Sequence, residues 1–474
     1  MNRIEYLTKA EYDTFTEHKV FSGGGVMELQ RQCAEKIRNW VFESKKALLV
    51  KGARQVGKTH LIRSVLHELD CDYLEINLIE TPSAVSLLEQ AETIEDLTLG
   101  LSAITEKVLV KGKSIIFIDE VQKYPDMVTK IKFFVDEGSF RYILSGSLLG
   151  VELTGLESAP VGYMSVLEMY PLSFSEFLQV ARIDTAVTDH LRQSFLNRIP
   201  VLEAVHEKML KLFTRYLLVG GMPEAVVAYA ETGNLNRVAA VHHDIYELYK
   251  MDFSQYESVD KKLLLENAYD LIPAELLKQN RRFIVTDLKK GLHFERVEST
   301  FLWLYKAGVA IPAFNATEPR IPLKLNEKQS LFKLYLSDVG MLTSLYGMNT
   351  KRMLLGNEPG LNAGGIYENA VAQELHSKGF PLYYYNSNRL GELDFVIESK
   401  DTVLPLEIKS GKDYTIHSAI NNCLSNPEYG MQEGIVFANC NVSTNGKVTY
   451  LPIYMMMFLE KDSEEQLTID PLFL

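Results

Sequence analysis

Cysteine is scarce in this sequence, and the few cysteines are scattered. Four occur in 474 residues, without the close pairs of a zinc site or the density of a disulfide framework. Long apolar runs are missing too, because no stretch reaches the roughly eighteen residues that a membrane-spanning helix needs. The first residues lack the basic and then apolar order of a signal peptide. These absences predict a cytoplasmic protein that does not span a membrane.

An excess of positive charge is also missing. The chain has 49 Lys and Arg against 62 Asp and Glu, and the formal net charge of −13 argues against coating nucleic acid by bulk electrostatics. Any contact with a polynucleotide must therefore be local. Repeats and low-complexity segments are absent, and 46% of the residues are hydrophobic, so the length predicts about three packed domains.

What the sequence does contain is a complete phosphate loop. Residues 52 to 59 match the pattern G-x-x-x-x-G-K-[ST], between a short apolar run and a helical pattern. Glycines let backbone N–H groups face the phosphates of a nucleoside triphosphate, Lys58 neutralises them, and Thr59 offers a hydroxyl to Mg²⁺. The candidate nucleotide-binding residues are Gly52, Ala53, Arg54, Gln55, Val56, Gly57, Lys58, Thr59 and, on a later strand, Ser145.

Two carboxylates follow a later apolar strand. Residues 114–118 predict a buried strand that ends at Asp119 and Glu120, which is a Walker B pattern. There Asp119 can hold Mg²⁺ through a water, and Glu120 can polarise the attacking water. Lys58 and Glu120 are thus the predicted catalytic residues of this site, and Thr59 and Asp119 the metal ligands. Ser145 or Ser147 can reach the γ-phosphate or the water, although an ordinary strand-to-turn Ser-Gly-Ser explains these serines equally well.

Strands alternate with helices over the first part of the chain. This alternation predicts an α/β fold whose mostly parallel sheet is covered on both faces. The pattern then becomes helical from Phe174 to Tyr256, with an interruption at residues 220–223, and predicts a helical lid. Further helices, a short strand at Arg281 to Val285, and a ribbon at residues 309–311 and 332–336 predict a winged-helix module.

A local basic excess lies within that module. Between Lys278 and Arg296 there are six Lys or Arg against two acidic residues. Such a run is more often a solvated face than a nucleic-acid surface. Both interpretations stay open.

Two strand-like runs near the carboxyl end, 393–398 and 403–409, predict a hairpin. Its even-numbered loop pairs Asp394 with Glu407 and puts Lys409 on the same face, while apolar residues share the other face. Two carboxylates and a lysine that converge can bind a divalent cation and activate a water for phosphodiester hydrolysis. The predicted helix before the hairpin carries Glu368, from which a further carboxylate can reach the same place.

This second site has catalytic candidates Asp394, Glu407 and Lys409 and metal-ligand candidates Glu368, Asp394 and Glu407. The alternative is a solvated face of salt bridges, because Glu-x-Lys is common on exposed strands. Pro405 in the second run predicts an edge strand or a bulge.

Several segments together resemble a prokaryotic family of AAA-type ATPases fused to a PD-(D/E)xK nuclease-like domain. They are Gly52 to Thr59, Ile118-Asp119-Glu120, Ser145-Gly146-Ser147, Tyr170-Pro171-Leu172-Ser173-Phe174, Gly220-Gly221-Met222-Pro223-Glu224, Lys333 to Gly340, and the set from Glu368 to Lys409.

The resemblance implies four parts and two cofactors. The parts are an ATPase core at 1–175, a helical lid at 176–256, a winged-helix-like domain at 257–348 and an α/β restriction-endonuclease-like domain at 349–474. The cofactors are ATP and Mg²⁺. In the same way, Asp394, Glu407 and Lys409 match the nuclease-like triad.

Two functional hypotheses follow. The leading one is a Mg²⁺-dependent ATPase whose nucleotide state controls a nuclease-like module that faces DNA or another nucleic acid. The alternative is an ATP-dependent regulatory switch that binds a protein partner or DNA without cleavage. The acidic net charge favours the alternative.

Overall fold

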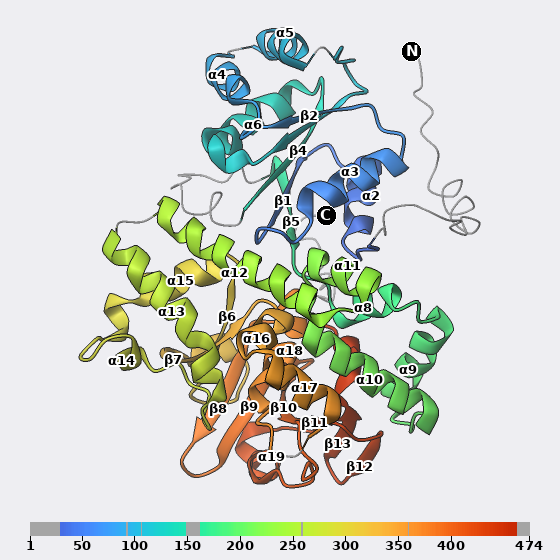
Figure 1. The fold of residues 1–474 in the computed structure, drawn as a ribbon, viewed down its shortest axis with the longest axis vertical. Helices are drawn as coiled ribbons and strands as arrows, with labels where there is room; N and C mark the ends of the chain where they lie inside the picture. Colours follow the sequence, from blue (N-terminus) through green and yellow to red (C-terminus); the bar gives the residue numbers. More distant parts are fainter. Residues whose placement is uncertain are drawn as a thin grey trace, which may run out of the picture.

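A five-stranded parallel sheet carries the phosphate loop in the upper part of the molecule (Figure 1). The computed structural model describes residues 29–461 except 92, 106, 148–161, 257–258 and 359. The strand order is β2-β3-β4-β1-β5, and neighbouring strands run parallel. This sheet confirms the expected α/β fold of the P-loop type. Its strands are β1 (Ala47–Gly52), β2 (Tyr73–Asn77), β3 (Ile115–Asp119), β4 (Arg141–Ser147) and β5 (Met164–Met169).

Helices cover both faces of this sheet. Alternate residues of β1 enter two different cores, since Leu48 and Val50 pack on one side and Ala47 and Leu49 on the other. Burial on both faces explains why these strands read as continuous apolar runs. One side packs against α2 (Ala34–Glu43) and α3 (Lys58–Glu68), and the other against α4 (Pro82–Gln90), α5 (Ile94–Thr105) and α6 (Asp126–Glu137).

A helical region follows the sheet, as the pattern predicts. In Figure 1 its long helix α12 crosses the molecule beneath β1 and β5 and lies between the parallel sheet and the lower part. The break at residues 220–223 separates α10 from α11. The helices are α8 (Phe174–Val180), α9 (Thr185–Asn197), α10 (Glu203–Val219), α11 (Pro223–Thr232) and α12 (Leu235–Tyr256).

The lower part is built on one eight-stranded mixed sheet, in the order β12-β13-β11-β10-β9-β8-β6-β7. The ribbon expected in a winged-helix module, β6 and β7, joins this sheet through a parallel pairing of β6 with β8. The sheet therefore runs across the expected domain boundary at residue 348. Its strands are β6 (Ala310–Ala316), β7 (Glu327–Leu336), β8 (Tyr383–Ser387), β9 (Gly391–Ser399), β10 (Thr402–Lys409), β11 (Gly434–Ala438), β12 (Ser443–Asn445) and β13 (Val448–Pro452).

Helices also surround this second sheet. The one that bears most on the chemistry is α18 (Gly364–Ser377), which is buried along nearly its whole length. The others are α13 (Val259–Leu277), α14 (Val285–Leu288), α15 (Glu298–Lys306), α16 (Val339–Leu345), α17 (Met348–Gly356) and α19 (Ser418–Ser425), with a final 3₁₀ turn, η5 (Ile453–Phe458). Among the described residues, no helix combines the length and the apolar composition that crossing a membrane requires.

Two local predictions are wrong. Residues 281–284 form no strand, and a short helix begins at Val285, because the segment makes a single backbone hydrogen bond to β7, from Phe283 N to Phe332 O at 2.9 Å. Pro405 lies neither on an edge strand nor at a bulge. Strand β10 is internal, its pairing with β9 is unbroken, and its ladder with β11 begins one residue later, at Leu406.

One hydrophobic core joins the two parts. The same cluster of buried side chains contains Val56 of the phosphate loop, Met222 of the helical region, Phe395 of β9 and Met457 of η5. Packed apolar side chains therefore connect the phosphate loop to the second sheet without a break, so a change of packing at the loop is passed on to that sheet.

Candidate functional site

The phosphate loop has the backbone conformation that its glycines predict. Gly57 adopts a left-handed φ of 91°, immediately before α3 begins at Lys58. At Gly52 a Cβ atom would lie 2.3 Å from the Met169 carbonyl oxygen of β5, so only glycine fits. The amino-terminal end of α3 thus faces the loop, where its free N–H groups favour an anion.

Lys58 folds back over this loop. Its Nζ donates to the carbonyl oxygens of Gly52 at 3.1 Å and Ala53 at 2.9 Å. Removal from water lowers the pKa of Lys58 to about 8, although the nearby carboxylates of Glu120 and Asp119 favour its charged form. An anion bound beside this ammonium would raise the pKa again.

Asp119 gathers the predicted metal-site residues. Thr59 Oγ1 donates to Asp119 Oδ2 at 2.9 Å, and Ser145 Oγ donates to the other carboxylate oxygen. Strand β4 lies between β1 and β3, which brings Ser145 between the loop and Asp119. The sequence reasoning missed Asn77, which pairs with Asp119 across β2 and β3 and approaches its Oδ2 at 3.5 Å. The sequence feature that could have identified Asn77 is its position at the carboxyl end of the predicted strand β2.

Glu120 is held in an unusual conformation. Its φ of 57° lies in the left-handed region, where a non-glycine residue carries strain. Gln122 fixes the side chain by donating to Glu120 Oε2, while its own Oε1 accepts from Ser147 N at 3.3 Å. No sequence signal pointed to Gln122.

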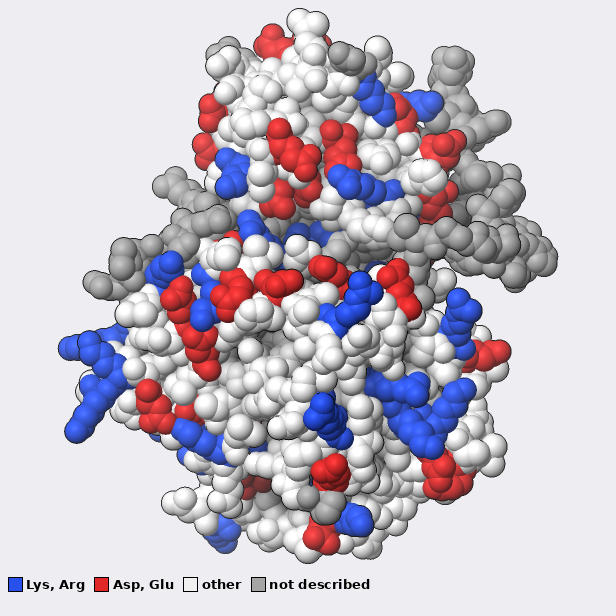
Figure 2. Space-filling model, viewed as in Figure 1, with Lys and Arg blue, Asp and Glu red and all other residues white. Residues whose placement is uncertain are grey.

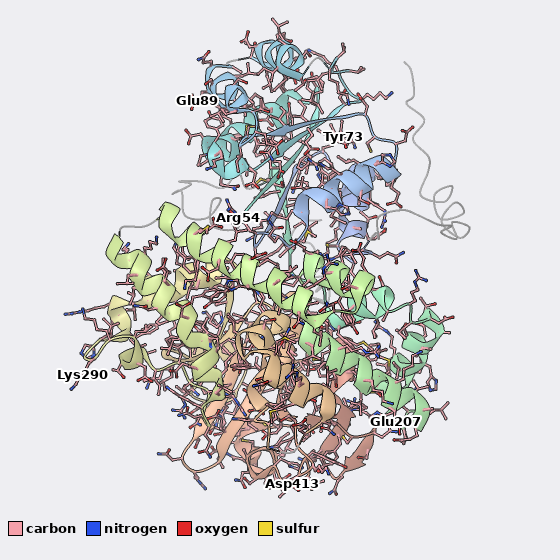
Figure 3. All side chains as sticks on the ribbon, viewed as in Figure 1. Arg54, Tyr73, Glu89, Glu207, Lys290 and Asp413 are labelled. Atoms are coloured by element: carbon pink, nitrogen blue, oxygen red, sulfur yellow. The ribbon has the colours of Figure 1, made fainter. Side chains whose placement is uncertain are left out.

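Helix α12 touches the phosphate loop directly. Arg54 Nη1 lies 2.7 Å from Asp252 Oδ1, and the hydroxyl of Tyr249 donates to the Arg54 carbonyl oxygen at 3.0 Å. Figure 3 shows Arg54 at the junction of the upper and lower parts. Burial raises the pKa of Asp252, and Arg54 opposes this shift. The loop residue Arg54 is therefore bound by the helical region.

The carboxyl-terminal hairpin has the predicted register. Leu406 pairs with Phe395, the same offset that sets Glu407 opposite Asp394, and the predicted apolar face packs into the large core. Asp394 Oδ2 accepts from Ile408 N at 2.8 Å, and Glu407 Oε1 lies 2.8 Å from Lys409 Nζ. Burial raises the pKa of Asp394 well above its ordinary value, and Glu368 and Glu407 add to this shift.

Glu368 reaches the same place from α18, but basic side chains surround it. It accepts from Arg281 Nη1, from Tyr335 Oη at 3.1 Å and from Lys333 Nζ at 3.4 Å. Burial acts to raise the pKa of Glu368, but the charges of Lys333 and Arg281 hold it below its ordinary value.

Lys333 is the centre of this cluster. It is fully buried, and its Nζ also lies 2.9 Å from Glu392 Oε1 and 4.0 Å from Asp394 Oδ1. Burial acts against its charge, yet these carboxylates raise the pKa of Lys333 above its ordinary value. The resulting carboxylate cluster consists of Arg281, Lys333, Tyr335, Glu368, Glu392, Asp394, Glu407 and Lys409.

Within the part of the chain that the structure describes, no group of three His, Cys, Asp or Glu is arranged to hold a metal ion. The metal and catalytic roles of the carboxylate cluster therefore stay predictions. Sequence reasoning missed Lys333 and Tyr335, although their alternation on β7 puts both on one face.

The basic segment from Lys278 to Arg296 offers fewer unpaired charges to a nucleic acid than its composition indicates. Arg281 belongs to the cluster, and Lys278 is paired with both Glu275 at 2.6 Å and Asp287 at 2.5 Å. The exposed remainder includes Lys290, which Figure 3 labels at the left edge of the molecule, and Figure 2 shows Lys or Arg side chains that project at this edge.

Three family profiles match separate parts of the chain. Residues 44–178 match the AAA domain, residues 210–352 a domain of unknown function (DUF8612), and residues 363–456 another (DUF4143). A search of curated proteins found no match.

Solved structures with similarity include a Walker-type ATPase of Pyrococcus abyssi, with 15% identity over 67% of this chain and 96% of that chain at a TM-score of 0.40. The Aeropyrum pernix Orc1 protein in complex with DNA has 14% identity over 66% and 90% at 0.30. A Thermotoga maritima RuvB variant has 15% identity over 61% and 88% at 0.28. The profile match and the phosphate loop together show that residues 44–178 form a AAA-type P-loop ATPase domain.

Proposed function

We propose that this protein is an ATP-dependent regulatory switch. ATP binding and hydrolysis at the phosphate loop change how the part of the chain after residue 176 engages a partner, and that part does not cut nucleic acid. The observation that carries the proposal is the pairing of Glu368 with Arg281 and Lys333, which belong to the chain itself; Lys333 also lies 4.0 Å from Asp394.

A divalent ion would have to compete with these internal cations. Lys333 is fully buried, and its ammonium lies within 4.0 Å of carboxylates from both α18 and β9. Placing a second cation beside Lys333 and Arg281 adds repulsion in a region of low dielectric. The cluster is thus accounted for as a buried charge network without a metal.

The ATPase site has a donor set that suits Mg²⁺ and ATP. Thr59 and Asp119 supply hard oxygen ligands whose side-chain oxygens lie 2.9 Å apart. Bound Mg²⁺ would neutralise charge on the β- and γ-phosphates. Lys58 would hold the phosphates, and Glu120 would orient the water that attacks the γ-phosphorus. Ser145 would keep Asp119 in position.

Nucleotide state would reach the helical region through Arg54. This residue lies inside the phosphate loop and forms an ion pair with Asp252 of α12. A γ-phosphate that attracts Arg54 would weaken its contact with Asp252 and so release α12. We infer that residues 176–256 act as a lid for this reason.

A second candidate is the Mg²⁺-dependent nuclease module. It is favoured by the convergence of Asp394, Glu407 and Lys409 on one face of β9 and β10, with Glu368 facing them. Under this candidate the partner is DNA, bound in part by exposed residues such as Lys289 and Lys290. Under the switch, the partner is a protein or uncut DNA.

The test is ATP hydrolysis by the purified full chain with Mg²⁺, with and without single- and double-stranded DNA, while DNA integrity is followed in the same tubes. The switch predicts turnover that Lys58→Ala abolishes, and intact DNA throughout. Cleavage that disappears in Asp394→Asn but persists in Asp413→Asn, a change on the exposed surface, would establish the nuclease instead.

A further inference from the structure

Arg31 connects three segments that are far apart in the sequence. It precedes α2, is 9% exposed, and donates from Nη1 to the Val56 carbonyl oxygen at 3.1 Å. It also donates to the Tyr170 carbonyl oxygen at the end of β5 and, from Nε, to Glu176 Oε1 at 3.2 Å. The first of these acceptors lies inside the phosphate loop. A buried arginine with three such acceptors fixes their relative positions.

Glu176 ties this arginine to the start of α8. Its Oε2 accepts from Ser173 N at 2.9 Å, and Ser173 Oγ accepts from Glu176 N at 3.3 Å, so the two residues form a reciprocal cap. The other oxygen of Glu176 also accepts from Gln32 N at 2.8 Å. The carboxylate is therefore shared between the helix cap and the arginine that contacts the loop.

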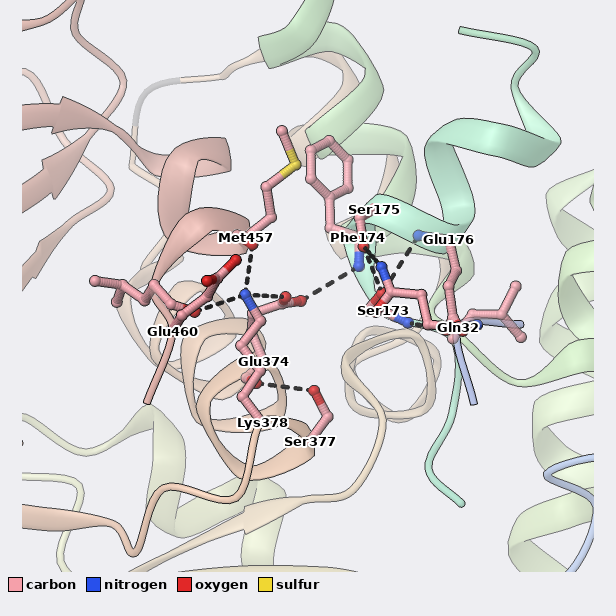
Figure 4. A network of polar contacts seen from close by, with 12 residues as sticks. Gln32, Ser173, Phe174, Ser175, Glu176, Glu374, Ser377, Lys378, Met457 and Glu460 are labelled. Atoms are coloured by element: carbon pink, nitrogen blue, oxygen red, sulfur yellow. Dashed lines mark hydrogen bonds and ion pairs between the residues drawn. The ribbon is translucent and has the colours of Figure 1, made fainter. Parts of the chain in front are cut away.

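The same cap is contacted from the lower part of the molecule. Phe174 N donates to Glu374 Oε2 of α18 at 3.3 Å, and Glu374 Oε1 lies 3.2 Å from Lys378 Nζ. Lys378 in turn donates to the carbonyl oxygens of Met457 and Leu459, at the end of η5. Figure 4 shows these contacts on the two sides of the cap, from Gln32 to Met457, joined by the backbone between Ser173 and Phe174.

We propose that Arg31 and Glu176 are positioning residues that hold the phosphate loop against the α8 cap and thereby link nucleotide binding to Glu374 in the carboxyl-terminal part. The proposal deepens the switch and rests on its ATPase site. Because coupling between two sites is reciprocal, a change at Glu374 must alter nucleotide affinity if the link exists.

The contact of Arg31 with the phosphate loop is tested with Arg31→Lys in the full chain. Lysine keeps the charge but has one donor nitrogen, so it cannot serve the Val56 and Tyr170 carbonyls and Glu176 together. Isothermal titration with the non-hydrolysable ATP analogue AMPPNP and Mg²⁺ should give about tenfold weaker binding. The control is Arg63→Lys, which alters an ion pair with Glu75 elsewhere in the same domain and should leave the affinity unchanged. Equal affinities of the two variants would overturn the positioning role.

The link between nucleotide binding and Glu374 is tested with Glu374→Gln. Its matched control is Glu275→Gln, because Glu275 is a similarly buried carboxylate paired with a lysine one turn later. Glu374→Gln should change the analogue affinity by at least about threefold, while Glu275→Gln should not. Equal affinities in these two proteins would rule out the link.

The double variant Arg31→Lys with Glu374→Gln separates one pathway from two independent effects. A shared pathway predicts a combined loss smaller than the product of the single losses, whereas multiplicative losses would contradict it. Thermal unfolding without nucleotide accompanies each titration, so a general loss of stability is measured separately. If the unaltered protein itself fails to bind the analogue, the ATPase proposal fails, independently of these residues.

Discussion

At the scale of single residues, the nucleotide site depends on a few oxygen and nitrogen atoms around Asp119 and Lys58. Thr59 and Ser145 each donate to Asp119, and Lys58 donates to two carbonyls of its own loop. These bonds keep the polar groups in place where a triphosphate and Mg²⁺ would replace some of them. The roles of individual residues can therefore be separated by substitution.

We expect substitution of Lys58 to impair nucleotide binding and substitution of Glu120 to impair hydrolysis. Lys58→Ala should weaken nucleotide binding by about 100-fold, because the ammonium that lies on the loop carbonyls and would neutralise the phosphates is lost. Glu120→Gln should bind normally yet hydrolyse ATP about 100-fold more slowly, because an amide cannot accept the proton of the attacking water. Equilibrium titration and phosphate release measure the two effects. Normal turnover by Glu120→Gln would remove Glu120 from the mechanism.

Nucleotide affinity should fall at alkaline pH. The pKa of Lys58 is lowered to about 8 in the free protein, chiefly by burial, so the ammonium is present below pH 8 and is lost above it. Bound phosphate favours the charged form and raises this pKa, so binding takes up a proton above pH 8. The dissociation constant should rise by up to about tenfold per pH unit there. A pH-independent affinity between pH 7 and 9.5 would contradict the assignment.

At the scale of elements, three segments contact one another at one joint: residues 170–174, 220–224 and 333–340. All three belong to the family resemblance, which assigns no chemistry to them. Leu172 N donates to the Gly221 carbonyl at 2.7 Å, and Gly221 N donates to Asp338 Oδ2 at 2.5 Å. The start of α16 lies directly on the turn between α10 and α11, since a Cβ at Gly340 would lie 2.5 Å from backbone atoms of Gly220 and Val219. This joint connects the end of β5, the helical region and the lower part.

Gly340→Ala should disrupt the joint. The added methyl group meets backbone atoms, which cannot move aside as a flexible side chain can, so we expect a loss of at least about 2 kcal/mol in the free energy of unfolding. Chemical denaturation measures it. Gly411→Ala is the control, because a Cβ at Gly411 has no neighbour within 4 Å, and its stability should be close to that of the unaltered protein.

The carboxylate cluster should depend on Lys333 and not on a metal. Lys333→Met leaves Glu368 and Asp394 without their shared cation, and breaking a buried ion pair in this way costs about 3–5 kcal/mol. EDTA, in contrast, should leave the unfolding temperature of the nucleotide-free protein unchanged. Differential scanning calorimetry measures both effects. A decrease on chelation that Mg²⁺ reverses would favour the metal site and the nuclease.

At the scale of the whole molecule, the two sheets are not independent units. The large core contains side chains from the phosphate loop, the helical region and the second sheet, and α12 lies between the two parts (Figure 1). Shared burial of this kind favours cooperative unfolding.

The nucleotide should accordingly stabilise the whole chain in one transition. At a concentration of analogue about 100 times the dissociation constant, the free energy of unfolding should increase by about 2.7 kcal/mol, because only the folded protein binds it. Calorimetry should show a single transition that moves upward as a whole, and no shift in Lys58→Ala. Two transitions, of which only one moves, would show that the parts unfold separately.

The sequence by itself determined the phosphate loop, the residues beside it and the register of the carboxyl-terminal hairpin. The phosphate loop, Asp119 with Thr59 and Ser145, and the offset of β9 against β10 follow from patterns within short segments, and the structure has the same strands and the same register. Periodicity and turn residues are local properties, so they can be read without knowledge of the rest of the chain.

Only the tertiary structure decided what faces these sites. Arg281, on a segment expected to be a strand, and Lys333, on a ribbon expected to be a wing, neutralise the Glu368 of a distant helix. Arg31 contacts the phosphate loop although it lies 25 residues before Val56 in the sequence, and Arg54 pairs with Asp252 of α12. The physical reason is that burial makes such long-range charge pairs strong, whereas no short segment contains both members of a pair.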